Sequence, residues 1–255
     1  MRTKTIRQIK EMLNDEHVSE DVLAMLENDE RKGVQRLVAS YKRKMKQLHE
    51  QIVAFNEKLT FDHQFKRHET DLIAGVDEAG RGPLAGPVVA ASVILPDDFR
   101  CYDLNDSKQL SAHKRLELYE RIKEEAICYS IKAIPATKID EWNILNATKR
   151  AMEMSVDSLH VQPDVVLIDA VHIEKSAPEQ HAVIKGDAKS IAIAAASILA
   201  KVSRDKTMQQ LHEQFPMYGF HRHMGYGTKE HIEAIKTYGI TEHHRLSFAP
   251  VKKNA

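Results

Sequence analysis

The sequence predicts an α/β protein in which a mixed sheet carries helices on its faces and is preceded by a helical arm. All eight prolines lie at Pro83 or later, and nine of the ten glycines lie at Gly75 or later. Both residue types disrupt helices, so this change in composition separates a helical arm, residues 1–70, from an α/β body, residues 71–255. Within the body, apolar runs of strand length alternate with segments of helical period, which indicates a sheet covered by helices.

Three helices are expected in the arm. Ile6 and Ile9 begin a short run of apolar residues at helical spacing, and Ser19 is a suitable N-cap for a second short helix. A longer periodic stretch then extends from Val34 to Phe55. Its apolar stripe should dock either on the earlier helices or on the body.

A basic run covers residues 31–46 of the arm. It contains seven bases and no acid: Arg31, Lys32, Arg36, Lys42, Arg43, Lys44 and Lys46. Such a run fits a solvated helix face as well as a phosphate-binding patch, and composition does not decide between them. Our hypothesis is that the arm strengthens binding of a nucleic-acid substrate.

The body is expected to contain five strands. The short link between the first two predicts antiparallel neighbours, and the uniformly apolar run at 165–168 fits a central strand buried on both faces. The expected strands are 72–77, 88–95, 128–134, 165–168 and a short one ending at Gly186, and the expected helices are 111–126, about 144–159 and a long one from Asp187 to about Phe215. Short helices and glycine-rich loops should follow, and residues 250–255 are predicted to form a disordered tail.

Composition excludes several classes of protein. The 37 basic and 37 acidic side chains cancel, so affinity for a nucleic acid must come from local clustering of charge. Cys101 and Cys128 lie in no metal-ligand pattern, which argues against a zinc site and a disulfide framework. The N-terminus has no apolar core of signal-peptide length, and the longest apolar-rich run, 191–200, is half the length of a membrane span. We therefore expect a cytoplasmic protein with no membrane partner.

Four acidic residues stand at informative positions. Asp77 ends the first expected strand and Glu78 follows it, Asp169 ends the buried strand, and Asp187 opens a helix. If the two acid-bearing strands are neighbours, these carboxylates converge and need a cation to offset their repulsion. Oxygen ligands favour Mg²⁺ or Mn²⁺, and two such ions form the clamp used for in-line displacement at phosphorus.

Residues suited to a sugar–phosphate backbone surround these acids. Gly80-Arg81-Gly82 combines close backbone approach with a guanidinium, although tight turns often have this composition. Further phosphate contacts are available from Lys108, Lys185, Lys201 and Arg204. Tyr226, between two glycines, is equally compatible with stacking on a ligand and with anchoring its loop. The alanines of 190–205 are interpreted as packing, and the C-terminal histidines as surface or nucleic-acid-facing residues.

The sequence resembles the ribonuclease HII family. The resemblance covers roughly residues 71–247 and rests on five motifs: Asp77-Glu78-Ala79-Gly80-Arg81-Gly82-Pro83 with the following AGPVVAA, Asp106-Ser107-Lys108, Leu167-Ile168-Asp169, Lys185-Gly186-Asp187 with AAASILAKVSRD, and Gly225-Tyr226-Gly227-Thr228. It implies a ribonuclease H-like sheet of five strands and an endonuclease that cuts the RNA strand of RNA–DNA hybrids.

The resemblance also implies roles for individual residues. It makes Asp77, Glu78, Asp169 and Asp187 the metal ligands, and has Gly80, Arg81 and Gly82 read a ribonucleotide 2′-hydroxyl. Tyr226 is implied to stack on the deoxyribose that follows the ribonucleotide. Lys108, Lys201 and Arg204 lie in matching motifs, with individual roles left open. Incision is implied 5′ of single ribonucleotides in duplex DNA, leaving 3′-hydroxyl and 5′-phosphate ends.

Three alternatives stay open at this point. A ribonuclease HIII-like enzyme would need a run of ribonucleotides, although the Gly-Arg-Gly sequence favours HII. A magnesium-dependent phosphatase for small molecules fits the acids but not the chain length. A non-catalytic module that binds hybrids is disfavoured by the intact set of four acids. In each reading we expect a monomer.

Overall fold

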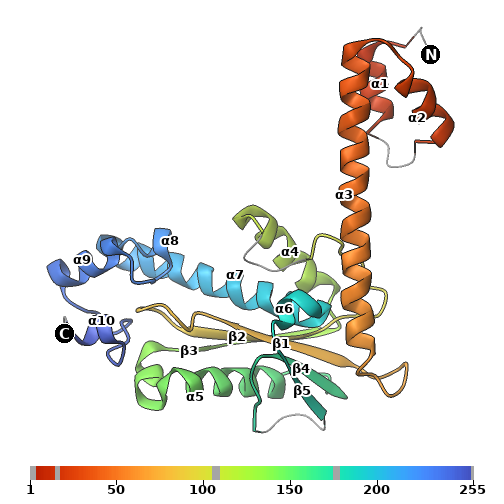
Figure 1. Ribbon diagram of the computed structural model, residues 1–255. Coiled ribbons are helices and arrows are strands. Elements are labelled where there is room, and N and C mark those ends of the chain that lie inside the picture. Colours follow the sequence, from red (N-terminus) through yellow and green to blue (C-terminus); the bar gives the residue numbers. More distant parts are fainter. Residues whose placement is uncertain (1–3, 15–17, 105–109, 175–178, 254–255) are drawn as a thin grey trace. The chain divides into compact units, whose positions relative to one another are not determined.

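The computed structural model describes residues 4–14, 18–104, 110–174 and 179–253. The chain divides into two compact units, Met1–Asn56 and Glu57–Ala255. The long helix α3 (Lys32–His63) passes from the first unit into the second (Figure 1). No helix among these described residues is long and apolar enough to cross a membrane.

The first unit contains α1 (Ile6–Met12), α2 (Glu20–Glu27) and most of α3. Thr5 and Ser19 begin the two short helices, each accepting a hydrogen bond from a main-chain N–H of the first turn. The stripe of α3 packs on these helices in one apolar cluster, whose buried members are Ile9, Leu13, Leu26, Val34, Val38 and Tyr41. The three predicted helices of the arm and their docking on one another are confirmed.

The second unit is built on a mixed sheet of five strands in the order β3-β2-β1-β4-β5. β1 pairs antiparallel with β2 and β2 with β3, whereas β4 runs parallel to both β1 and β5. The predicted fold class is therefore confirmed. The strands are β1 (Ile73–Ala79), β2 (Val88–Ile94), β3 (Cys128–Ile134), β4 (Val165–Asp169) and β5 (Glu179–Val183).

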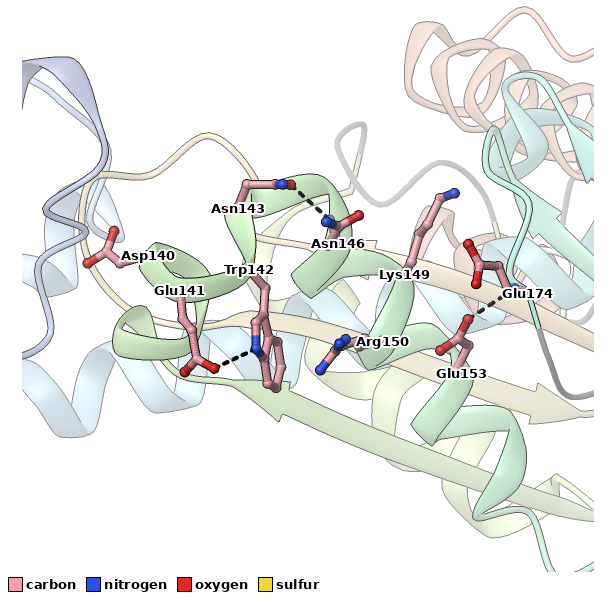
Figure 2. A pocket seen from close by; sticks show the side chains of 9 residues that line it. All are labelled: Asp140, Glu141, Trp142, Asn143, Asn146, Lys149, Arg150, Glu153 and Glu174. Carbon is pink, nitrogen blue, oxygen red and sulfur yellow. Dashed lines mark hydrogen bonds between the residues drawn. The ribbon is translucent and has the colours of Figure 1, made fainter.

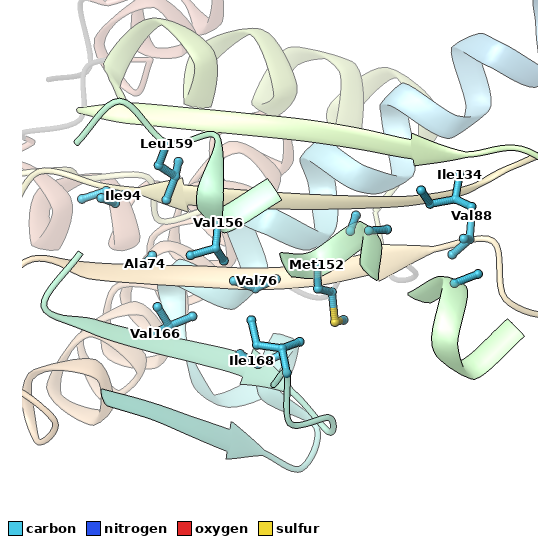
Figure 3. Packing of buried hydrophobic residues seen from close by; sticks show 14 of the residues in the cluster. Ala74, Val76, Val88, Ile94, Ile134, Met152, Val156, Leu159, Val166 and Ile168 are labelled. Carbon is cyan, nitrogen blue, oxygen red and sulfur yellow. The ribbon is translucent and has the colours of Figure 1, made fainter. Parts of the chain in front are cut away.

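Two long helices cover opposite faces of the sheet (Figure 1). α5 (Ala136–Asp157) covers one face and α7 (Ile191–Gln214) the other. Val76 of β1 and Ile168 of β4 pack against Met152 and Val156 of α5 in a dry core (Figure 3). The remaining helical elements are α4 (Ala112–Glu125), α6 (Gly186–Lys189), η1 (Pro216–Tyr218), α8 (Phe220–His223), α9 (Lys229–Tyr238) and α10 (Ala249–Lys252).

The alanine-rich helix α7 lies unusually close to β1. Its central alanines are buried, which confirms that they serve packing. A Cβ atom added to Gly75 would lie 2.0 Å from the carbonyl carbon of Ala192, so only glycine permits this approach. The contact fixes the distance between α7 and the strand that bears Asp77.

The predicted start of the long helix at Asp187 is wrong. Ser190 has an extended backbone and separates the short helix α6 from α7. Its side chain accepts from the N–H of Ile193, at 3.1 Å, and the carboxylate of Asp62 accepts from Ala192 N at 3.0 Å. These two caps satisfy the first N–H groups of α7, and burial raises the pKa of Asp62 to about 6.

Two further expectations need correction. The helix expected to begin near residue 144 begins at Ala136, because two helical segments meet across a kink at Asn143. Residues 250–253 are not a disordered tail, because they belong to α10 and its C-cap, and Val251 is fully buried beside Ile235 of α9. Apolar burial of this single side chain anchors the segment.

Replacing Gly75 by alanine should destabilise the protein by about 1–3 kcal/mol or more, because the added methyl group overlaps the backbone of α7. Urea unfolding followed by circular dichroism measures the change. Gly82→Ala is the matched control, since its methyl group would meet Tyr226 at an ordinary 3.5 Å. Equal unfolding midpoints for the two variants would show that the close approach of α7 is not a constraint.

Candidate active site

The pairing of β1 with β4 brings two predicted acids to one face of the sheet. Gly75 is in register with Leu167, and side chains alternate along each strand. Two residues further along, Asp77 and Asp169 therefore face the same side, the side covered by α7. Contrary to expectation, Asp77 does not end its strand, because β1 continues to Ala79.

These acids line a hollow of about 380 Å³ together with most of the predicted site residues. Its described lining is Asp77, Glu78, Ala79, Gly80, Arg81, Gly82, Asp169, Ser197, Lys201, Arg204 and Tyr226. Asp187 is buried but is not among the described residues that line this hollow. Lys108, with the Asp106-Ser107-Lys108 motif, lies outside the described residues.

Asp77 is the most enclosed carboxylate of the group, with 5% of its surface exposed. Burial, with repulsion from Glu78 and Asp169, raises its pKa well above the usual range. The main-chain N–H of Glu78 donates to Asp77 Oδ1 at 2.7 Å, and the hydroxyl of Ser197 on α7 also donates to this carboxyl group. Two donors thus partly offset the cost of a buried negative charge.

Glu78 has one oxygen engaged and one without a partner. Arg81 Nη1 approaches Glu78 Oε1 at 3.4 Å, while Oε2 is buried and has no hydrogen bond within the described structure. Burial raises the pKa of Glu78, Arg81 lowers it, and Asp169 raises it, with a net upward shift. Such a buried, unsatisfied oxygen is suited to a cation.

The donor set fits a divalent metal ion by its chemistry. Carboxylate oxygens that repel one another and one orphaned oxygen are what a hard cation would satisfy. Within the described ranges, however, no three histidine, cysteine or acidic side chains are already arranged around a single point as ligands.

Asp169 and α6 are joined by the main chain of Gly186, whose N–H donates to Asp169 Oδ1 at 2.7 Å. This bond places Asp187, the next residue, beside the β4 end of the site. Ala170 and Lys185 both adopt positive φ angles, 54° and 56°. Left-handed backbone at two non-glycine residues is costly and concentrates strain on either side of this connection.

The residues that follow Gly-Arg-Gly are hydrogen-bonded to the loop that carries Tyr226. The N–H groups of Leu84 and Ala85 both donate to the carbonyl of Gly225, at 2.8 and 3.3 Å. The ring of Tyr226 is 47% exposed and lies next to Gly82, where a Cβ would be 3.5 Å from Tyr226 Cε1. An exposed ring therefore borders backbone that a ligand can approach closely.

The prediction that the C-terminal histidines are surface residues is wrong for His223, His231 and His244, all of which are buried. Thr241 N–H donates to His244 Nδ1, His244 Nε2 donates to His231 Nε2 at 3.2 Å, and His231 Nδ1 donates to the carbonyl of Tyr226 at 2.9 Å. This series of hydrogen bonds requires both imidazole rings to be neutral. We call His231 and His244 the histidine relay.

Two site residues carry roles that the sequence did not indicate. Arg204 is buried and donates to the carbonyls of Pro87 and Ala85, so its guanidinium supports the backbone behind the hollow. Ser197 was not predicted at all. It lies four residues before Lys201 and seven before Arg204, and this polar stripe through an apolar helix was the available signal.

Comparisons with known proteins agree with this geometry. Residues 74–251 match the profile described as Ribonuclease HII, and residues 5–66 match the Ribonuclease HII N-terminal domain. Ribonuclease HII of Lactobacillus acidophilus is 51% identical, over 97% of this chain and 98% of its own length. The chain belongs to the ribonuclease HII family. Members of this family are metal-dependent endoribonucleases that act on RNA–DNA hybrids.

Solved structures of ribonucleases H share the fold. The ribonuclease H2 of Pyrococcus horikoshii OT3 has a TM-score of 0.62 and 26% identity, over 72% of this chain and 96% of the other. Bst-RNase HIII, solved in complex with Mn²⁺, has a TM-score of 0.59 and 21% identity, over 76% of this chain and 71% of the other. The fold of ribonuclease HII thus extends to the HIII enzymes.

Among the described residues, the carboxylate hollow is not the largest one. A hollow of about 600 Å³ lies along α5 around Trp142 (Figure 2). Its polar groups are largely satisfied by one another: Glu141 accepts from Trp142 Nε1, and Glu153 accepts from the N–H of Glu174. Because its lining mixes acidic and basic side chains, size alone does not make it a site for this chemistry.

The histidine relay should make stability depend on pH. Burial lowers the pKa of His231 and of His244 to about 4, from about 6.5 in an unfolded chain. The unfolded state therefore binds more protons than the folded state between these two pH values. The contribution of the two histidines to the free energy of unfolding is thus fully present above pH 6.5 and is lost as the pH falls towards 4. Urea unfolding midpoints measured at pH 7.5, 6 and 5 test this.

The midpoint of His244→Asn should depend less on pH than that of the wild type. An unchanged pH dependence of the midpoint would refute the relay.

Proposed function

We propose that this chain incises duplex DNA on the 5′ side of a single embedded ribonucleotide, as well as cutting longer RNA–DNA hybrids, and leaves 3′-hydroxyl and 5′-phosphate ends. One observation carries the proposal. The carboxylates of Asp77, Glu78 and Asp169 share a hollow with the Gly-Arg-Gly backbone and with Tyr226. Acids suited to phosphoryl chemistry therefore border groups suited to recognising one sugar.

Asp77, Glu78, Asp169 and Asp187 are the residues proposed to hold two divalent ions, Mg²⁺ or Mn²⁺. The unpartnered Oε2 of Glu78 and the repulsion that raises the pKa of Asp77 support this assignment. When bound, the ions would supply an activated water and stabilise charge on the leaving oxygen. The protein itself contributes positioning, through the Ser197 hydroxyl on Asp77 and the Gly186 N–H on Asp169.

Recognition of the substrate is assigned to the Gly-Arg-Gly segment and Tyr226, which line the same hollow. Gly80, Arg81 and Gly82 offer main-chain groups to a 2′-hydroxyl, the group that distinguishes RNA from DNA. Tyr226 would stack on the deoxyribose that follows the ribonucleotide, consistent with its exposed ring beside Gly82. Arg81 and Lys201 bring positive charge to the phosphates, although Lys201 now pairs with Asp205 at 2.8 Å.

The arm is proposed to increase affinity for the duplex. Lys32, Arg36 and Arg43 project within about 40° of one another on α3, on the side away from the apolar stripe. All three are exposed, and within the described part of the chain Arg36 and Arg43 form no ion pair. A row of uncompensated bases is suited to neutralising successive phosphates. The expectation of a cytoplasmic monomer stays a prediction.

The reaction is tested with a labelled DNA duplex that contains one ribonucleotide. We expect cutting immediately 5′ of that ribonucleotide with Mg²⁺ or Mn²⁺, none with EDTA, and a loss of at least about a hundredfold in Asp169→Asn, whose metal ligation is weakened. Cutting confined to long hybrids would instead indicate an HIII-like enzyme. No cutting of either substrate by folded protein would leave a non-catalytic binding module.

The contribution of the arm is tested by Arg36→Glu combined with Arg43→Glu. Removing two phosphate contacts should raise KM about tenfold at moderate salt and reduce the slope of log affinity against log salt by about 2, with kcat unchanged. Arg7→Glu with Lys10→Glu is the control, because it changes net charge equally but lies on α1. Equal effects of the two double variants would mean that only net charge matters.

A further inference from the structure

Arg245 is a fully buried arginine, with 0% of its surface exposed, in the loop after α9. Its guanidinium donates to main-chain carbonyls only. Nη2 donates to Gly80 O at 2.6 Å and to Gly86 O at 2.9 Å, Nη1 donates to Arg81 O at 2.9 Å, and Nε donates to Gly86 O at 3.0 Å. One cation therefore holds both ends of the segment from Gly80 to Gly86.

Two of these carbonyls belong to peptide groups that face the proposed recognition site. The carbonyl of Gly80 shares its peptide group with the N–H of Arg81, and the carbonyl of Arg81 shares its peptide group with the N–H of Gly82. Within the described structure neither N–H donates to another residue. A peptide whose oxygen accepts from a cation is polarised, and its N–H becomes a stronger donor.

We propose that Arg245 is a positioning residue for discrimination of ribose from deoxyribose, acting by fixing and polarising the Arg81 and Gly82 amides that would meet the 2′-hydroxyl. This inference rests on the proposed function, and it names a residue that sets how strongly the 2′-hydroxyl is recognised. Arg245 touches neither the ribose nor the metal ligands in this assignment. Its effect reaches the substrate only through the peptide groups it holds.

The charge of Arg245 is available for this role because no carboxylate within the described ranges forms an ion pair with it. The carboxylate of Asp140 instead accepts from the main-chain N–H groups of Leu246 and Ser247, both at 2.8 Å. Burial, with repulsion from Arg204, lowers the pKa of Arg245 to about 9, so the guanidinium remains charged at neutral pH. The hydrogen bonds of this guanidinium therefore all go to main-chain carbonyls, and it also lies over the ring of Phe248 at 5.1 Å.

The test measures binding by fluorescence anisotropy in EDTA, where no cutting occurs. Wild-type protein, Arg245→Lys and Arg245→Gln are each titrated with a duplex that contains one ribonucleotide and with the all-DNA duplex of the same sequence. Wild type should prefer the ribonucleotide duplex. Arg245→Gln should reduce this preference about three- to tenfold, the loss expected when a strong hydrogen bond becomes an ordinary one, and Arg245→Lys should lie between.

Asp140→Asn is the matched control, because it loosens the same loop without touching the Gly-Arg-Gly backbone. It should lower the melting temperature but leave the ratio of the two Kd values unchanged. If Arg245→Gln also lowers the melting temperature with an unchanged ratio, Arg245 is only a structural staple and the inference fails. Failure of the proposed function is different, since wild type would then bind both duplexes equally and cut neither.

A second measurement does not depend on the glutamine variant being folded. In protein labelled with ¹⁵N-glycine, Arg245→Lys should move the amide proton of Gly82 upfield, because one ammonium group cannot hold all three carbonyls. Gly239, which has open space around it, should not shift. An unmoved Gly82 resonance would exclude polarisation by Arg245.

Discussion

Asp77 and Asp169 lie on the same face of adjacent strands, and Glu78 is added to them within a largely buried hollow. Repulsion among these carboxylates is the force that the rest of the catalytic unit has to oppose. The sheet opposes it by geometry, since strand pairing fixes where the acids stand. α7 adds a hydroxyl donor from Ser197, and its position depends on the bare backbone of Gly75. Strand pairing and the packing of α7 thus set the positions of these acids within the hollow.

Recognition is organised differently from catalysis. Hydrogen bonds from buried polar groups hold the Gly-Arg-Gly segment and the Tyr226 loop. Arg245 donates to the carbonyls of Gly80 and Arg81, and Arg204 donates to those of Ala85 and Pro87 just after them. The histidine relay holds the carbonyl of Tyr226. Because these donors come from α7 and from the segments after it, the C-terminal part of the chain supports the hollow as well as lining it through Lys201, Arg204 and Tyr226.

Elements with a strong periodic signal could be predicted from the sequence, and features that depend on contacts between distant residues could not. The strand that contains Asp169 was evident from its uniformly apolar residues, and Ser19 from its position before a helix. The break at Ser190 was missed because the carboxylate of Asp62, which accepts from Ala192 N at the start of α7, lies 130 positions before Ala192 in the chain. His231 and His244 were misjudged for a similar reason, since their Nε2 atoms meet each other across 13 positions of the chain.

Arg245 shows the same limitation at the site itself. From sequence alone, an arginine near the end of a chain is predicted to be a solvated or phosphate-binding residue, because burying its charge normally requires a carboxylate partner. Here main-chain carbonyls replace the carboxylate as hydrogen-bond acceptors. Such carbonyls become available only where a glycine-rich segment does not pair in a sheet. The glycines that let a sugar approach the backbone thus also leave carbonyls unsatisfied on the other side. The lack of sheet pairing that leaves one side of the segment accessible to a ligand therefore also explains the buried arginine on its other side.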